Sequence, residues 1–131
     1  MMSLYIVLAR ADRAVVESME RVPLRYAGQH PYVGLRARPS DAVRRYNLTF
    51  PGGVSPEAHV MLELVFTTSG IARYCTEATE EAHGFVPRLT KRVYYDGGRD
   101  WGVWHFIGDL PLGEEEYIIP AWRDITAGDM A

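Results

Sequence analysis

Short apolar runs, separated by glycine, proline and charged residues, dominate the hydrophobic pattern of this chain. Ser3–Leu8, Tyr32–Arg36 and His59–Phe66 are rich in Val, Ile, Leu and Tyr, and each is bounded by polar or turn residues, which predicts a β-strand. The third run is the most hydrophobic. We therefore expect it at the centre of a sheet, where both faces of a strand are covered.

The second half of the chain predicts a hairpin and one further strand. Lys91–Tyr95 and Trp101–Ile107 flank Asp96-Gly97-Gly98. Because glycine accepts the positive φ values that a tight turn needs, this pattern predicts a tight β-hairpin. A final strand is expected from Glu115 to Ile119, ending at Pro120.

Three helices are expected between these strands, from apolar residues that recur at helical spacing next to capping residues. The first begins at Asp12, ends before Pro23 and turns Val15, Met19 and Val22 inward. The second begins at Pro39-Ser40-Asp41, ends near Asn47 and buries Ala42, Val43 and Tyr46. The third is capped by Ser69, closes at Gly84 and carries the apolar stripe Ile71, Tyr74, Cys75, Ala78 and Ala82.

This order of elements predicts a single α+β domain over residues 1–131, with a mixed, mostly antiparallel sheet and three short helices. A ferredoxin-like α/β sandwich is the alternative. The composition agrees with one packed core, since 47% of the residues are hydrophobic and 24% are charged.

Charge and cysteine content narrow the classes of function. The net charge of -3 disfavours binding to nucleic acid by bulk electrostatics. The single cysteine, Cys75, excludes an internal disulfide framework and a zinc site built from thiolates, and the spacing of the four histidines predicts no metal site. Without a signal-like or membrane-spanning apolar run, we expect a cytoplasmic protein that does not contact a membrane.

The chemistry-bearing segment is Gly113-Glu114-Glu115-Glu116-Tyr117-Ile118-Ile119-Pro120. On a strand, Glu114 and Glu116 would share one face. Two carboxylates beside one cleft can divide their roles: one binds a ribose hydroxyl and the other steers or deprotonates an acceptor. Cleavage of a glycosidic bond to ribose builds oxocarbenium character, and hydrogen bonds to the 2-hydroxyl strengthen in that transition state.

This segment resembles the Glu-x-Glu signature of arginine- and asparagine-directed ADP-ribosyltransferases, in which an acidic pair opens a late strand. Phe66-Thr67-Thr68-Ser69 is similar to the Ser-Thr-Ser-like element of the family, and Arg10 matches loosely an arginine of its first strand. The resemblance implies a mono-ADP-ribosyltransferase that uses NAD as substrate. Glu116 and Glu114 would be its catalytic residues, and Arg10, Thr68 and Ser69 would contact NAD.

In a second register, Tyr32-Val33-Gly34-Leu35-Arg36 occupies the place of the Ser-Thr-Ser strand. The chain then resembles the histidine-tyrosine-glutamate branch of the family. Tyr32 becomes the NAD contact of the second strand, while Tyr5-Ile6 stands where that branch has histidine.

Four other interpretations remain open. The glutamates can form a solvated strand entrance that discourages aggregation, and Thr67-Thr68-Ser69 can be a strand end followed by a helix cap. The chain as a whole can be a non-catalytic binding or assembly module, viral or toxin-related, that retains the fold. A transferase acting on RNA phosphate is less favoured: the arginines of the first half encourage it and the net negative charge opposes it.

Overall fold

The computed structural model describes residues 1–20, 22, 26, 33–77, 93–96, 103–106 and 114–131. Its strands are β1 (Met2–Ala9), β2 (Val33–Arg36), β3 (His59–Phe66), β4 (Cys75–Glu77), β5 (Val93–Asp96), β6 (Val103–Phe106) and β7 (Ile118–Asp124). Its helices are the 3-10 turn η1 (Arg10–Asp12) and the α-helices α1 (Arg13–Met19), α2 (Pro39–Thr49), α3 (Thr68–Tyr74) and α5 (Ala127–Met130).

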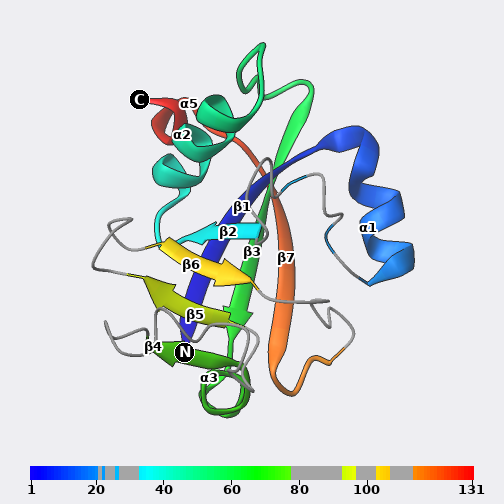
Figure 1. Cartoon of the computed structure of the whole chain (residues 1–131). Coiled ribbons are helices and arrows are strands. Elements are labelled where there is room, and N and C mark those ends of the chain that lie inside the picture. Colours follow the sequence, from blue (N-terminus) through cyan, green and yellow to red (C-terminus); the bar gives the residue numbers. More distant parts are fainter. Residues whose placement is uncertain (21, 23–25, 27–32, 78–92, 97–102, 107–113) are drawn as a thin grey trace.

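The strands form one seven-stranded sheet in the order β4-β5-β6-β2-β1-β3-β7 (Figure 1). Only the β4–β5 pair is parallel among the described pairs, which confirms a mixed, mostly antiparallel α+β fold. The sheet twists strongly, so that β5 and β6 cross β1 and β3 in Figure 1 instead of running along them. A ferredoxin-like domain follows the order βαββαβ, which this chain does not, so that alternative is wrong.

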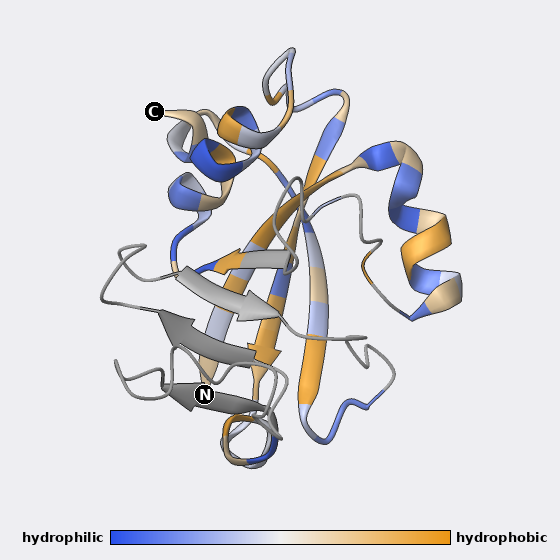
Figure 2. Cartoon of the chain, viewed as in Figure 1, coloured by the Kyte–Doolittle hydropathy of each residue, from blue (hydrophilic) through white to orange (hydrophobic). Residues whose placement is uncertain are grey.

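β1 and β3 form the buried pair at the core of the fold, and both are strongly apolar (Figure 2). β3 is covered on both faces, as its apolar run predicts, but it lies between β1 and the edge strand β7 and is not the middle strand of the sheet. β1 and β3 pair along their whole length, from Met2 with Phe66 to Ala9 with His59. Successive side chains of a strand point to opposite faces, and both faces of this pair are covered. One face carries Leu4, Ile6 and Leu8 of β1, and the other carries Val7 together with Met61 of β3.

Different elements cover the two faces. On the first face, Val16 of α1 joins the cluster that contains Leu4, Leu62 and Leu64. On the second face, Ala42 and Val43 of α2 and Ile125, just before α5, pack against Val7 and Met61. Figure 1 shows α2 and α5 together at one end of the sheet, whereas α3 lies at the opposite end, near the N-terminus.

The first helix presents a different face from the one that its spacing predicts. Val15 and Met19 are 48% and 47% exposed, whereas Val16 is fully buried. The chain leaves β1 through the 3-10 turn η1, and α1 begins only at Arg13 and ends at Met19, followed by Glu20 with φ 51°. The helical period predicts which residues share a face of α1, but the path of the chain through η1 decides which of these faces turns toward the core. Val22 is buried as expected, but it lies beyond the helix.

The third helix is shorter than predicted. It ends at Tyr74, and Cys75 begins β4, which pairs in parallel with β5. Hydrogen bonds to a distant strand therefore override the apolar helical stripe over these residues, while the part of the stripe from Ala78 to Gly84 lies outside the described residues.

The hairpin of β5 and β6 is confirmed by their antiparallel pairing, which ends at Asp96 with Val103. Residues 97–102, which include the predicted turn at Gly97-Gly98, lie outside the described residues. The expected strand from Tyr32 is described as β2 from Val33, and the second helix continues two residues beyond Asn47, to Thr49.

Candidate functional site

The three glutamates precede the last strand and do not lie on it. Glu114 is followed by a turn over residues 115–117, and β7 begins only at Ile118. The carbonyl of Glu114 accepts hydrogen bonds from the backbone N–H groups of Tyr117 and Ile118, both at 2.9 Å, which curls the chain here. The expectation that Glu114 and Glu116 share a strand face is therefore wrong. Glu114, Glu115 and Glu116 are all exposed.

The strand itself continues through Pro120, where the sequence predicts its end. Pro120 pairs with Leu64, and the pairing extends to Asp124 with Val60. β7 is an edge strand of the sheet. Proline has no backbone N–H to donate, and an edge strand tolerates it because positions that face away from the sheet have no neighbouring strand to bond.

Thr67 joins the turn of residues 114–117, which we call the acidic turn, to the start of α3. Its backbone N–H donates to the carbonyl of Tyr117 at 3.0 Å, and its hydroxyl donates to the carbonyl of Glu116 at 2.8 Å. The same hydroxyl accepts from the N–H of Gly70 at 3.0 Å. Thr67 thus caps the helix, which corrects the assignment of the cap to Ser69. Thr68 and Ser69 lie exposed in the first turn of α3.

Gly70 allows the helix to approach this turn closely. A Cβ atom on Gly70 would lie 1.9 Å from the carbonyl oxygen and 2.7 Å from the carbonyl carbon of Tyr117. No side chain fits between these two backbones. The segments of Thr68-Ser69 and Glu114-Glu116, which the family resemblance places in one site, therefore lie side by side.

Tyr117 and Arg73 belong to the same surface, although the sequence does not single them out. The Arg73 guanidinium carbon lies 4.7 Å from the centroid of the Tyr117 ring, within the range of a cation–π contact. A hydrogen bond with the Glu116 side chain raises the pKa of Tyr117, and the charge of Arg73 acts in the opposite direction. We call Thr68, Ser69, Glu114, Glu116 and Tyr117, with Arg73, the acidic site.

Arg10 lies at the other end of the sheet. It directly follows β1, its backbone N–H donates to the carbonyl of Ala58, and its guanidinium bonds Asp124 at 2.7 Å. The acidic site adjoins the opposite end of β3, where Phe66 pairs with Ile118. The eight residues of β3 span about 25 Å at roughly 3.3 Å per residue. Arg10 is thus not brought to the acidic site, and Tyr32 lies outside the described residues.

Three arginines of the first half of the chain form ion pairs with carboxylates among the described residues. Arg10 pairs with Asp124, Arg13 with Glu17 at 3.0 Å and Arg44 with Asp41 at 3.7 Å. Such pairing reduces the positive field that a polyanion would meet. Arg21 and Arg25 lie outside the described residues.

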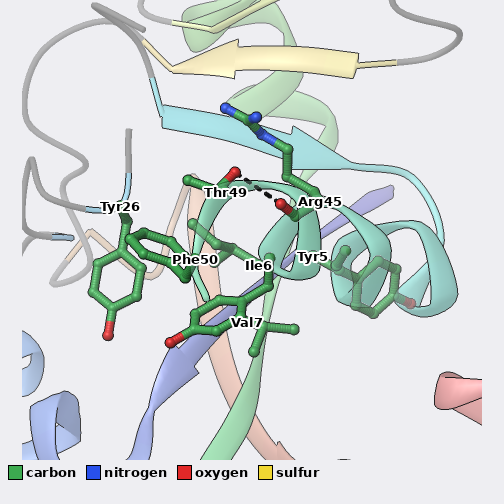
Figure 3. Close-up of a pocket in the computed structure, with 9 residues that line it drawn as sticks. Tyr5, Ile6, Val7, Tyr26, Arg45, Thr49 and Phe50 are labelled. Atoms are coloured by element: carbon green, nitrogen blue, oxygen red, sulfur yellow. Dashed lines mark hydrogen bonds between the residues drawn. The ribbon is translucent and has the colours of Figure 1, made fainter. Parts of the chain in front are cut away.

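A pocket opens between α2 and the middle of β1, lined by Tyr5, Ile6, Val7, Tyr26, Ala42, Arg45, Tyr46, Thr49 and Phe50 (Figure 3). The Tyr26 and Phe50 rings meet edge to face at 5.9 Å, and the Phe50 and Tyr46 rings lie 4.7 Å apart. The cavity volume of about 10 Å³ is on the scale that one water molecule requires. The pocket is thus too small for a nucleotide, and none of its lining residues belongs to the acidic site.

The described residues contain no group of three or more His, Cys, Asp and Glu side chains arranged to hold a metal ion. Within the same ranges, every helix is too short or too polar to cross a lipid bilayer.

Comparison with known proteins adds no relative. No protein family, no curated protein and no solved structure matches the chain.

Proposed function

We propose that the chain is an ADP-ribosyltransferase-like protein that uses NAD as donor at the acidic site. The observation that supports this is the contact between two segments nearly fifty residues apart. Thr67 bonds the carbonyls of Glu116 and Tyr117, so that Thr68 and Ser69 adjoin the acidic turn. These are the segments that resemble the Ser-Thr-Ser-like and Glu-x-Glu elements of the transferases.

In this proposal Glu116 binds a hydroxyl of the nicotinamide ribose. As the bond between nicotinamide and ribose breaks, its electron pair leaves with nicotinamide, and the ribose gains positive charge. A carboxylate hydrogen-bonded to the ribose hydroxyl stabilises that charge most in the transition state. Glu114 orients the acceptor, takes its proton and promotes its attack on the ribose carbon. The acceptor is a protein side chain or a small molecule.

The place of Arg10 changes the expected NAD contacts. Arg10 is paired with Asp124 at the far end of β3, so its guanidinium would not reach a nucleotide bound beside Glu116. Arg73, which stacks on the Tyr117 ring, is the guanidinium of the acidic site. Under this proposal Arg73 takes the position of the cation that faces the NAD phosphates, for which guanidinium is well suited.

A non-catalytic binding or assembly module is the second candidate, and one observation favours it. Glu114, Glu115 and Glu116 are all exposed, on a turn that leads into an edge strand. Exposed charges at such a position also prevent association between sheet edges. The two candidates differ in whether the protein cleaves NAD.

The test compares E116Q with the matched control E115Q, since both replace an exposed glutamate of the same turn. We expect the unmodified protein to release nicotinamide from NAD, followed by proton NMR. We expect E116Q to lose about a hundredfold or more of this rate, on the scale of removing one group that stabilises charge in the transition state, and E115Q to keep it. No nicotinamide release by the unmodified protein, or full activity of E116Q, refutes the transferase and favours the module.

A further inference from the structure

One face of α3 meets both the backbone and the ring of Tyr117. Gly70 packs against the Tyr117 carbonyl so closely that a Cβ atom would lie 1.9 Å from its oxygen. Arg73 follows three residues later, and residues three apart are neighbours on the surface of a helix. The guanidinium carbon of Arg73 lies 4.7 Å from the centroid of the Tyr117 ring. The way α3 docks on the acidic turn therefore also brings Arg73 over this ring.

The contact orders a long side chain at an exposed position. Arg73 lies exposed in the last turn of α3, and an arginine that keeps to one rotamer gives up conformational entropy. Tyr117 offers a fixed partner. Its backbone N–H donates to the Glu114 carbonyl at 2.9 Å, and its carbonyl accepts from the N–H of Thr67 at 3.0 Å. The attraction between guanidinium and the face of an aromatic ring offsets part of the entropy that Arg73 loses.

A donor that carries phosphate needs a cation at this surface. The acidic turn presents the exposed carboxylates of Glu114, Glu115 and Glu116, and negative charges repel the diphosphate of NAD. A guanidinium group can donate two parallel hydrogen bonds to phosphate oxygens. A contact with the face of a ring does not consume the N–H groups, which lie at the edge of the guanidinium plane. Arg73 can therefore stack on Tyr117 and bind phosphate at the same time.

We propose that Tyr117 is a positioning residue for Arg73, whose ring holds the guanidinium where the diphosphate of the donor arrives. The acidic site then recognises a phosphorylated donor and not a nucleoside. This inference rests on the proposed function for its effect on the reaction. In this role Tyr117 touches no reacting atom, so we expect its ring to affect KM for NAD and not kcat.

Y117L and Y117F separate the ring from the rest of the side chain, because only Y117F keeps an aromatic face under Arg73. A cation–π contact at an exposed site changes an equilibrium constant about two- to fivefold. We therefore expect Y117L to raise KM for NAD by that factor, with kcat unchanged. Y117F should rescue KM, because the stacking remains. An unchanged KM in Y117L overturns the positioning role.

R73A tests the same contact from the other side, at an exposed residue whose loss leaves the core intact. We expect KM for NAD to rise about tenfold, the effect of losing hydrogen bonds to a charged group. KM for nicotinamide riboside, which has no phosphate, should not change. R44A, which removes an exposed arginine of α2, is the matched control. Once Arg73 is replaced, adding Y117L should raise KM no further. If R73A raises KM equally for both donors, the diphosphate role is wrong.

A further measurement needs no reaction. Protons held over an aromatic ring shift upfield in NMR spectra, so the side-chain protons of Arg73, identified with R73A, report the stacking. We expect Y117L but not Y117F to abolish this shift, and inorganic pyrophosphate to perturb the Arg73 Nε signal. If no nicotinamide is released but both results hold, the transferase fails and the binding of diphosphate by Arg73 stands. Arg73 signals that are the same in Y117L, or that do not respond to pyrophosphate, overturn the inference whatever the activity.

Discussion

The contact between α3 and the acidic turn predicts a large effect of one added methyl group. In G70A, the new Cβ would meet the carbonyl oxygen of Tyr117 at 1.9 Å, where ordinary contacts begin at 3.4 Å. Helix and turn must therefore move apart by about 1.5 Å. Both sides of the contact are backbone, so no side chain can rotate away to relieve it.

The cost follows from the contacts that such a movement disturbs. Overpacking by a methyl group costs about 1–3 kcal/mol, and each bond from Thr67 to the carbonyls of Glu116 and Tyr117 contributes about 1 kcal/mol. Alanine is favoured over glycine within a helix by about 1 kcal/mol, which offsets part of this. The net expectation is a loss of about 2–4 kcal/mol in the free energy of unfolding, with Tm lower by about 10 °C.

Urea unfolding followed by tryptophan fluorescence measures this loss. G128A is the matched control, because a Cβ on Gly128 of α5 meets only the Thr126 hydroxyl, at 3.6 Å, an ordinary contact. We expect G128A to be as stable as the original chain or slightly more stable. If G70A unfolds within about 0.5 kcal/mol of the original protein, smaller than any of the terms above, the close approach of α3 to Tyr117 is refuted.

Two further predictions concern residues far from the acidic site. Y26F removes a hydroxyl that accepts from the Ala9 N–H at 2.8 Å and donates to Asp12. Because Tyr26 is 4% exposed, we expect a loss of about 1–3 kcal/mol in urea unfolding; Y46F, at a partly exposed position, should lose less, and an equal loss would contradict the argument. The hydrogen bond with Arg123 holds the pKa of Asp129 below its usual range. The resulting stability is present above the unfolded-state pKa of about 3.9 and disappears as pH falls through the lower folded-state pKa. Unfolding at several pH values should therefore show D129N less stable near neutrality and converging with the original chain in acid, and a difference independent of pH would refute this.

The local apolar pattern predicts the centre of the fold well. The run His59–Phe66 matches β3 at both ends, and Ser3–Leu8 matches β1 within one residue at each end. Ala42 and Val43 are buried on α2 as expected. Each of these segments is apolar enough to be buried whatever surrounds it, so a pattern read within a few residues is sufficient.

The pattern fails where a distant partner decides between two local structures. Cys75 continues an apolar helical stripe but pairs with Val93 of β5, and Pro120 would end an isolated strand but is accommodated at the sheet edge. The helix α5 has only four residues, too few to show a helical period in the sequence, although Thr126 and Asp129 form its capping box.

At the acidic site, the groups that are present can be predicted from the chain alone: a run of carboxylates late in the chain and a Thr-Thr-Ser segment after a buried strand. Their arrangement depends on the folded protein, in which these segments touch, Arg73 and Tyr117 join them and Arg10 lies at the other end of β3. The difference comes from the distance over which each effect acts. Side-chain chemistry and apolar periodicity belong to neighbouring residues, whereas the hydrogen bonds of Thr67 and the close contact of Gly70 exist only after β3 and β7 pair and bring the two segments together.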